Sequence, residues 1–139
     1  MVRWSTAKTR GRRGWVSEHE FTELLGLSQI DIMLDTFPYN GATTICDALW
    51  MGAPAITLAG QLAVARAGAS ILTAVGLPDL VSNSVADYID AAVRLASDRS
   101  SLASLRQSLR QRMLASPLMN AAAFVRDLER AYRAMWDAR

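Results

Sequence analysis

Two neighbouring hydroxyl side chains, Thr43 and Thr44, follow a Pro-Tyr-Asn-Gly turn in the stretch DTFPYNGATTICDALWMGAP, residues 35–54. They fall on the first turn of a predicted helix, where free backbone N–H groups and the positive end of the helix dipole attract anions. Gly41 has no Cβ, so the backbone there can approach a ligand closely. Asp47 lies one helical turn after Thr43, where a carboxylate can accept hydrogen bonds from ribose hydroxyls. The spacing therefore fits a nucleotide, with phosphate at the helix tip and ribose one turn deeper.

The same spacing also fits a plainer interpretation, in which Thr43 is an N-cap and Asp47 a surface acid. The turn is not a P-loop, because no Gly-Lys-Ser/Thr follows it. The chain has one cysteine, Cys46, which excludes a disulfide framework and a cysteine-based metal site. Spacing alone leaves both interpretations open, and we expect no metal.

The elements around this turn alternate between strand and helix. Apolar runs predict strands over 30–35 and 55–58, helices over 42–52 and 63–76, and a weaker third strand within 77–82. This alternation predicts an α/β fold with a parallel sheet, a partial Rossmann-like arrangement with right-handed crossovers. Ligands of such sheets bind beyond the carboxyl ends of the strands, which is where the 36–44 turn lies.

After Ser84 the pattern is helical, over 84–97, 99–115 and a last helix beyond the break at SPLMN, 116–120. Apolar side chains at helical spacing predict core or bundle faces in the first and last of these helices. These side chains are Val85, Tyr88, Ile89, Ala92, Val93 and Ala96, and then Phe124, Leu128, Tyr132, Met135 and Trp136. Arginines 106, 110 and 112, between the apolar positions of the middle helix, are expected on a solvated face.

The length of 139 residues allows a single domain, and the composition is that of a folded protein. Five of the fifteen basic residues lie within the first thirteen positions, so the net charge of residues 14–139 is −3. We therefore expect residues 1–13 to be a basic, flexible N-terminus and the body not to bind nucleic acid. No apolar run is long enough to cross a bilayer and no secretory signal is visible, which predicts no membrane partner and a cytoplasmic location.

Several stretches together resemble one known family. DIMLDTFPYNGATTICDALWMGAPAITLAG, ARAGASILTAVGLPDLV, SPL and the terminal LERAYRAMW are similar to the C-terminal part of O-GlcNAc transferase/SPINDLY glycosyltransferases. The resemblance covers residues 14–139. It implies the C-terminal, nucleotide-sugar-binding domain of a GT-B architecture. The implied reaction transfers N-acetylglucosamine from UDP-GlcNAc to Ser or Thr hydroxyls of an acceptor protein, with no further cofactor.

The resemblance also assigns site residues. Thr43 and Thr44 match the pair that binds the UDP diphosphate, and Asp47 matches the acid that holds the ribose. Asn40 and Gly41 belong to the same donor loop. His19 lies in the region that contacts uracil in the family, although a lone histidine there also fits a helix cap or a surface residue.

Two departures from the family bear on function. Ala42 stands where some members have a histidine, which removes one hydrogen-bond donor. The helical repeat region, the first catalytic domain and the opening strands of the second domain have no counterpart in these 139 residues. We therefore expect no catalytic residue in this chain. We expect instead a truncated form or one half of a split enzyme, a donor-binding portion that is inactive alone; in the split case a partner chain carries the missing N-terminal half. The alternatives are a non-catalytic nucleotide-binding or protein-interaction module, and a nucleic-acid binder that uses the basic N-terminus.

Overall fold

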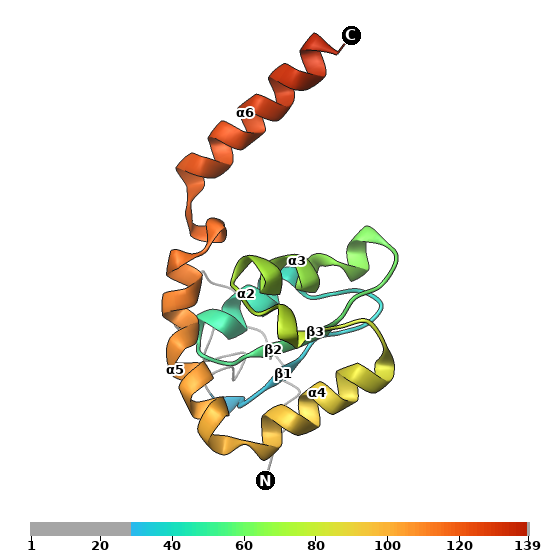
Figure 1. Cartoon of the computed structure of the whole chain (residues 1–139), viewed down its shortest axis with the longest axis vertical. Helices are drawn as coiled ribbons and strands as arrows, with labels where there is room; N and C mark the ends of the chain where they lie inside the picture. The colour runs from blue at the N-terminus through green and yellow to red at the C-terminus, as the bar shows by residue number, and fades with distance from the viewer. Residues whose placement is uncertain (1–28, 139) are drawn as a thin grey trace, which may run out of the picture.

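The computed structural model describes residues 29–138, which form a parallel three-stranded sheet with helices around it (Figure 1). The strand order is β1-β2-β3, with β1 at Met33–Leu34, β2 at Ala55–Leu58 and β3 at Val81–Ser82. The predicted α/β class is confirmed, including the weak third strand, which follows the short 3₁₀ turn Pro78–Leu80. This prediction succeeded because apolar strand runs separated by helical segments require parallel crossovers.

The central strand β2 is buried along its whole length, as its apolar sequence predicts. The first strand is shorter than predicted, since only Met33 and Leu34 pair, with Ala55 and Ile56. The backbone N–H of Asp35 still donates to the Ile56 carbonyl at 3.0 Å, so Asp35 continues the line of β1 at its carboxyl end. This end of the sheet is where the predicted site lies.

Helices α2, Ala42–Trp50, and α3, Ala67–Ala74, lie on one side of the sheet, and α4, Val85–Ser97, lies on the other (Figure 1). Both α2 and α3 are followed by a glycine in the left-handed region, with φ 82° at Gly52 and 76° at Gly76. Glycine adopts this conformation without the strain that a Cβ would impose, which explains why these helices end there. Helix α3 is shorter than the helix predicted over 63–76, because residues Ala63–Ala65 form a separate 3₁₀ turn.

Helix α5, Arg99–Ala115, runs along the side of the body and buries Leu109 and Met113 in the core (Figure 1). The core also contains side chains of α2, α3 and β2, among them Ile45, Leu49, Ala55, Leu72 and Val75. The bounds predicted for α5 are confirmed. The Asp98 side chain caps its N-terminus by accepting the Ser101 N–H at 3.0 Å.

The prediction of a solvated arginine face on α5 holds for Arg110 and Arg112, which are exposed, whereas Arg106 is half-buried; all three also contact residues outside α5. Arg106 forms an ion pair with Asp31, and the Arg110 guanidinium lies 4.4 Å from the centroid of the Trp50 ring. Arg112 Nη1 donates to the Gly76 carbonyl at 3.2 Å. These contacts link the surface of α5 to the segment before β1, to α2 and to the glycine that follows α3.

The predicted core faces of α4 and α6 are largely wrong. On α4 the buried residue is Ala91, whereas Val85, Ile89 and Val93 are 54–61% exposed. Helix α6, Ala121–Asp137, projects away from the α/β body (Figure 1) and buries none of its side chains. Helical periodicity identifies an apolar face, but it does not say that the same chain covers that face.

No helix within residues 29–138 combines the length and the hydropathy needed to span a membrane. His19, the basic positions 1–13 and the start of the 14–139 region lie outside the described residues.

Candidate functional site at the start of α2

The N-terminus of α2 follows the turn that leaves the carboxyl end of β1. Gly41 is the N-cap, with φ −86° and ψ 91°, and no side chain caps the helix. The first turn contains no acidic residue, and the side chains of Thr43 and Thr44 are exposed. The alternative interpretation of Thr43 as an N-cap is therefore wrong. The uncapped first turn leaves its N–H groups and two hydroxyls available to an anion.

A hollow of about 340 Å³ lies against this helix end. It brings together four of the predicted site residues, Asn40, Gly41, Thr43 and Thr44. Its lining is Thr36, Tyr39, Asn40, Gly41, Ala42, Thr43, Thr44, Val64 and Ala67. Ala67 is the first residue of α3, so two helix N-termini border the same hollow. Both helix dipoles direct their positive ends toward it, which favours a negatively charged ligand.

Gly41 does not need to be glycine for conformational reasons, because its φ is negative. A Cβ added there would lie 3.5 Å from the Thr44 side chain, which is ordinary van der Waals contact. Glycine at this position therefore matters only where a ligand approaches the backbone. The predicted close approach remains a prediction.

Asp47 lies one turn further along α2 and is half-buried, outside the lining of the hollow. Burial of the Cys46 thiol, and then the negative charge of Asp47, raise the pKa of that thiol. A raised pKa keeps that thiol protonated at neutral pH, so Cys46 is a poor nucleophile. Asp47 thus lies one helical turn beyond the hollow and is not brought together with the other predicted site residues, so its contact with ribose stays a prediction.

Asn40 is 2% exposed, and both ends of its side-chain amide bond within the protein. Its Nδ2 donates to the Thr36 carbonyl at 3.1 Å, and its Oδ1 accepts the Gly68 N–H at 3.3 Å. Its own N–H donates to the Val64 carbonyl at 3.0 Å. Asn40 thus ties the turn to the start of α3. This geometry gives its side chain a role in shaping the site.

The sequence analysis missed Asp35 and Thr57 as parts of the site. The Asp35 carboxylate is 4% exposed; its Oδ1 accepts the Gly41 N–H at 2.9 Å and its Oδ2 accepts the Thr57 hydroxyl at 2.6 Å. The signal was an acid at the end of one buried strand and a threonine inside the next. Connecting them required the pairing register of β1 and β2, which the sequence does not state.

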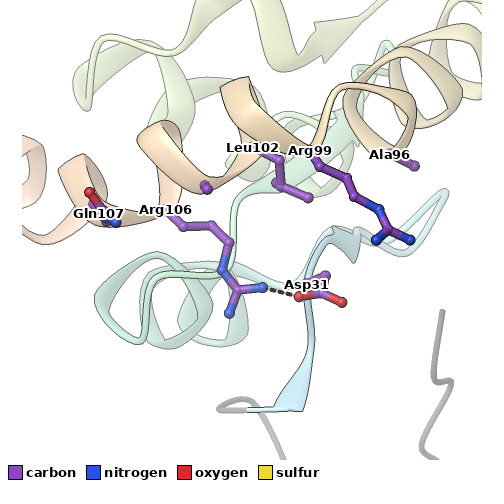
Figure 2. Close-up of a pocket in the computed structure, with 7 residues that line it drawn as sticks. Asp31, Ala96, Arg99, Leu102, Arg106 and Gln107 are labelled. Atoms are coloured by element: carbon purple, nitrogen blue, oxygen red, sulfur yellow. Dashed lines mark hydrogen bonds and ion pairs between the residues drawn. The ribbon is translucent and has the colours of Figure 1, made fainter. Parts of the chain in front are cut away.

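A larger hollow of about 560 Å³ lies at the opposite, amino end of β1. Arg106 pairs there with Asp31, and Arg99 extends toward the same space (Figure 2). None of the predicted site residues of the described chain lines it. Parallel α/β sheets bind ligands at the carboxyl ends of their strands, so the smaller hollow is the better candidate despite its size.

Comparison with known proteins agrees with this assignment of the fold. The family model of glycosyl transferase family 41 matches residues 24–128. A Hordeum vulgare protein named probable UDP-N-acetylglucosamine–peptide N-acetylglucosaminyltransferase SPINDLY is 50% identical over 109 residues, 78% of this chain and 12% of that protein. The Arabidopsis thaliana protein with the same enzyme name and the designation SEC is 39% identical over 108 residues, 77% of this chain and 11% of that protein.

Among solved structures, a mutant O-GlcNAc transferase from Thermobaculum terrenum superposes with a TM-score of 0.74 at 43% identity. The match covers 82% of this chain and 22% of that one. The chain thus spans about an eighth of the length of the curated SPINDLY relatives it matches. A family model that matches most of the chain and a superposition at this identity agree with the predicted resemblance. The chain belongs to glycosyl transferase family 41.

Proposed function

We propose that this chain is the donor-binding portion of a UDP-GlcNAc-dependent protein O-GlcNAc transferase-like enzyme. The observation that carries the proposal is the uncapped N-terminus of α2, with Gly41, Thr43 and Thr44 around one hollow. The names of the family relatives supply the donor class and the protein acceptor. We expect the reaction to need no cofactor beyond the sugar donor, and the cytoplasmic location remains a prediction from the sequence.

The site would bind the diphosphate of the donor through hydrogen bonds from the first turn of α2. The backbone N–H groups and the Thr43 and Thr44 hydroxyls are donors, and the helix dipole adds positive potential. In the transfer, an acceptor Ser or Thr hydroxyl attacks the anomeric carbon while the bond to the diphosphate oxygen breaks and UDP leaves with the electron pair. Donors held at the departing diphosphate stabilise this charge, typically by a few kcal/mol.

We assign no catalytic residue to this chain. We propose that the acceptor and the catalytic groups belong to the part of the enzyme that the relatives have outside the region matched here, whether on the same chain or on a partner chain. The competing proposal, a module that binds nucleotide without transfer, shares the same site. It differs in predicting no transfer when the missing half is supplied.

Titration calorimetry of the full chain with UDP tests the site. Replacing both hydroxyls in Thr43→Val/Thr44→Val removes two hydrogen bonds of about 1–1.5 kcal/mol each, so UDP affinity should fall roughly 30- to 150-fold. Thr73→Val, an exposed threonine on α3, is the matched control and should bind UDP like the unsubstituted chain. Equal affinities in the double variant and the control would reject the site.

A further inference from the structure

The turn between β1 and α2, residues 36–41, is held in place by the buried residue that precedes it, Asp35. Beyond the two carboxylate bonds of Asp35 described above, its backbone carbonyl accepts the Tyr88 hydroxyl at 2.9 Å. Its N–H donates to Ile56. Both backbone polar groups and both carboxylate oxygens of Asp35 are therefore hydrogen-bonded, two of the four to β2. The residue joins β2, the N-cap of α2 and helix α4 at one point.

Helix α4, which contains Tyr88, lies on the opposite side of the sheet to α2 (Figure 1). Burial of the Tyr88 hydroxyl, and then the negative charge of Asp35, raise its pKa above the ordinary value of 10.0. The hydroxyl thus stays protonated and can donate at any physiological pH. The hydrogen bond from the Tyr88 hydroxyl therefore holds the backbone carbonyl of Asp35, the residue immediately before the turn.

Helix α3 packs closely against the Asp35–Thr57 pair through Gly68. Gly68 of α3 is buried, and a Cβ added there would lie 2.4 Å from Thr57 Oγ1 and 2.7 Å from Asp35 Oδ2. Helix α3 therefore packs its backbone directly on the Asp35–Thr57 pair. Asn40 adds a second tie between the turn and the Gly68 N–H. Side chains and backbone of four elements therefore contact the two ends of the turn.

We propose that Asp35, Thr57 and Tyr88 are positioning residues for the donor diphosphate. They hold Gly41 and the first turn of α2 in the phosphate-binding geometry before the donor arrives. The inference rests on the proposed function, since it assigns these residues to the same donor site. Fixing the backbone of a flexible residue opposes binding through lost conformational entropy, so a turn ordered in advance spares the donor that loss. None of the three residues needs to touch the donor for this effect.

Three substitutions test the proposal in the full chain. Thr57→Val removes the hydroxyl that holds Oδ2 of Asp35, and Tyr88→Phe removes the bond to its carbonyl. Each should weaken UDP affinity about 5- to 10-fold, the equivalent of one hydrogen bond. Each should also speed amide hydrogen exchange at Gly41, whose N–H is held by Asp35. Thr57→Ser keeps the hydroxyl and should restore both properties. Tyr132→Phe, on the exposed face of α6, is the matched control.

The outcomes separate this inference from the proposed function. If Thr57→Val and Tyr88→Phe bind UDP normally while Thr43→Val/Thr44→Val does not, the positioning role is wrong and the site stands. If Thr57→Ser loses as much affinity as Thr57→Val, packing and not the hydroxyl is responsible, which also overturns the inference. If the unsubstituted chain does not bind UDP, the proposed function fails. In that case, faster amide hydrogen exchange at Gly41 in the variants would still show that Thr57 and Tyr88 order the turn. Unchanged exchange at Gly41 would show that they do not.

Discussion

Gly68 lies directly against Thr57: a Cβ added to Gly68 would be only 2.4 Å from the Thr57 hydroxyl oxygen, which is too close for two non-bonded atoms. The same Cβ position is 2.7 Å from Asp35 Oδ2, the carboxylate oxygen that accepts the Thr57 hydroxyl at 2.6 Å. The start of α3 can thus approach β2 only because residue 68 has no side chain. A helix N-terminus and a buried hydrogen bond depend on one glycine.

Gly68→Ala should lower the free energy of unfolding by about 1–3 kcal/mol, because the added methyl overpacks a buried polar pair. Alanine is the better helix former, but the gain is at most about 1 kcal/mol and smaller in the first turn. Urea unfolding followed by circular dichroism measures the difference. Gly41→Ala is the matched control, since its Cβ would meet only ordinary contacts and should change stability by less than about 0.5 kcal/mol. Equal stability of the two variants would contradict the packing described here.

Sequence periodicity located the elements well where local signals and tertiary contacts agree. The strand Ala55–Leu58 is entirely apolar except for Thr57, and α5 begins at the Asp98 cap and ends before Pro117, so both were predicted with their observed bounds. The apolar faces of α4 and α6 were predicted as core and are largely exposed. An apolar pattern identifies the face of a helix that is suited to burial. It does not show whether this chain or another surface buries that face.

The candidate site was predictable in its local part only. Gly41, Thr43 and Thr44 lie within four residues, so helix geometry alone brings them to one end of α2. Asp35 and Thr57 are 22 positions apart and meet only through the register of β1 with β2. That register depends on packing across the whole sheet. The pattern of residues within one strand does not reveal how that strand pairs with its neighbour.

Asp98 should make stability depend on pH in the acid range. Hydrogen bonds from the backbone N–H and hydroxyl of Ser101, and from the hydroxyl of Ser100, lower the pKa of Asp98 from 3.8 to about 2. A carboxyl group with a lowered folded-state pKa stabilises the protein above pH 4, and this contribution is lost as the pH falls through 2. The melting temperature of the unsubstituted chain should therefore fall relative to Asp98→Asn between pH 4 and pH 2. Asparagine caps without titrating. A constant difference across that range would show that the cap is not charge-dependent.

Asp47→Ala should weaken UDP binding more than pyrophosphate binding, if the carboxylate accepts the ribose hydroxyls. Asp47 lies outside the lining of the phosphate hollow, so pyrophosphate should bind the variant with little loss. A hydrogen bond to a charged acceptor contributes about 1.5–3 kcal/mol, which predicts roughly a 10- to 150-fold loss for UDP. Competition calorimetry with both ligands measures the ratio. Equal losses for UDP and pyrophosphate would place Asp47 in a structural role on α2.

Helix α6 and the outer face of α4 leave large apolar side chains exposed, among them Ile89, Phe124, Tyr132 and Trp136. Exposed apolar surface of this kind favours association, so the chain alone should self-associate more than a covered domain would. Analytical ultracentrifugation with and without a co-expressed N-terminal half from a full-length relative measures the effect. Unchanged self-association in the presence of that half would show that it does not cover these faces.

The isolated chain should not glycosylate protein, although it should bind UDP. Holding two reactants together supplies about 7–11 kcal/mol of the barrier to their reaction, and a chain that spans about an eighth of its curated relatives holds only the donor in this proposal. The test incubates the purified chain with labelled UDP-GlcNAc and an acceptor protein, alone and mixed with the N-terminal half from a full-length relative. Transfer by the chain alone would refute the prediction. Transfer in the mixture, lost again in Thr43→Val/Thr44→Val, would show a competent donor half. UDP binding with no transfer in either case would favour the non-catalytic module.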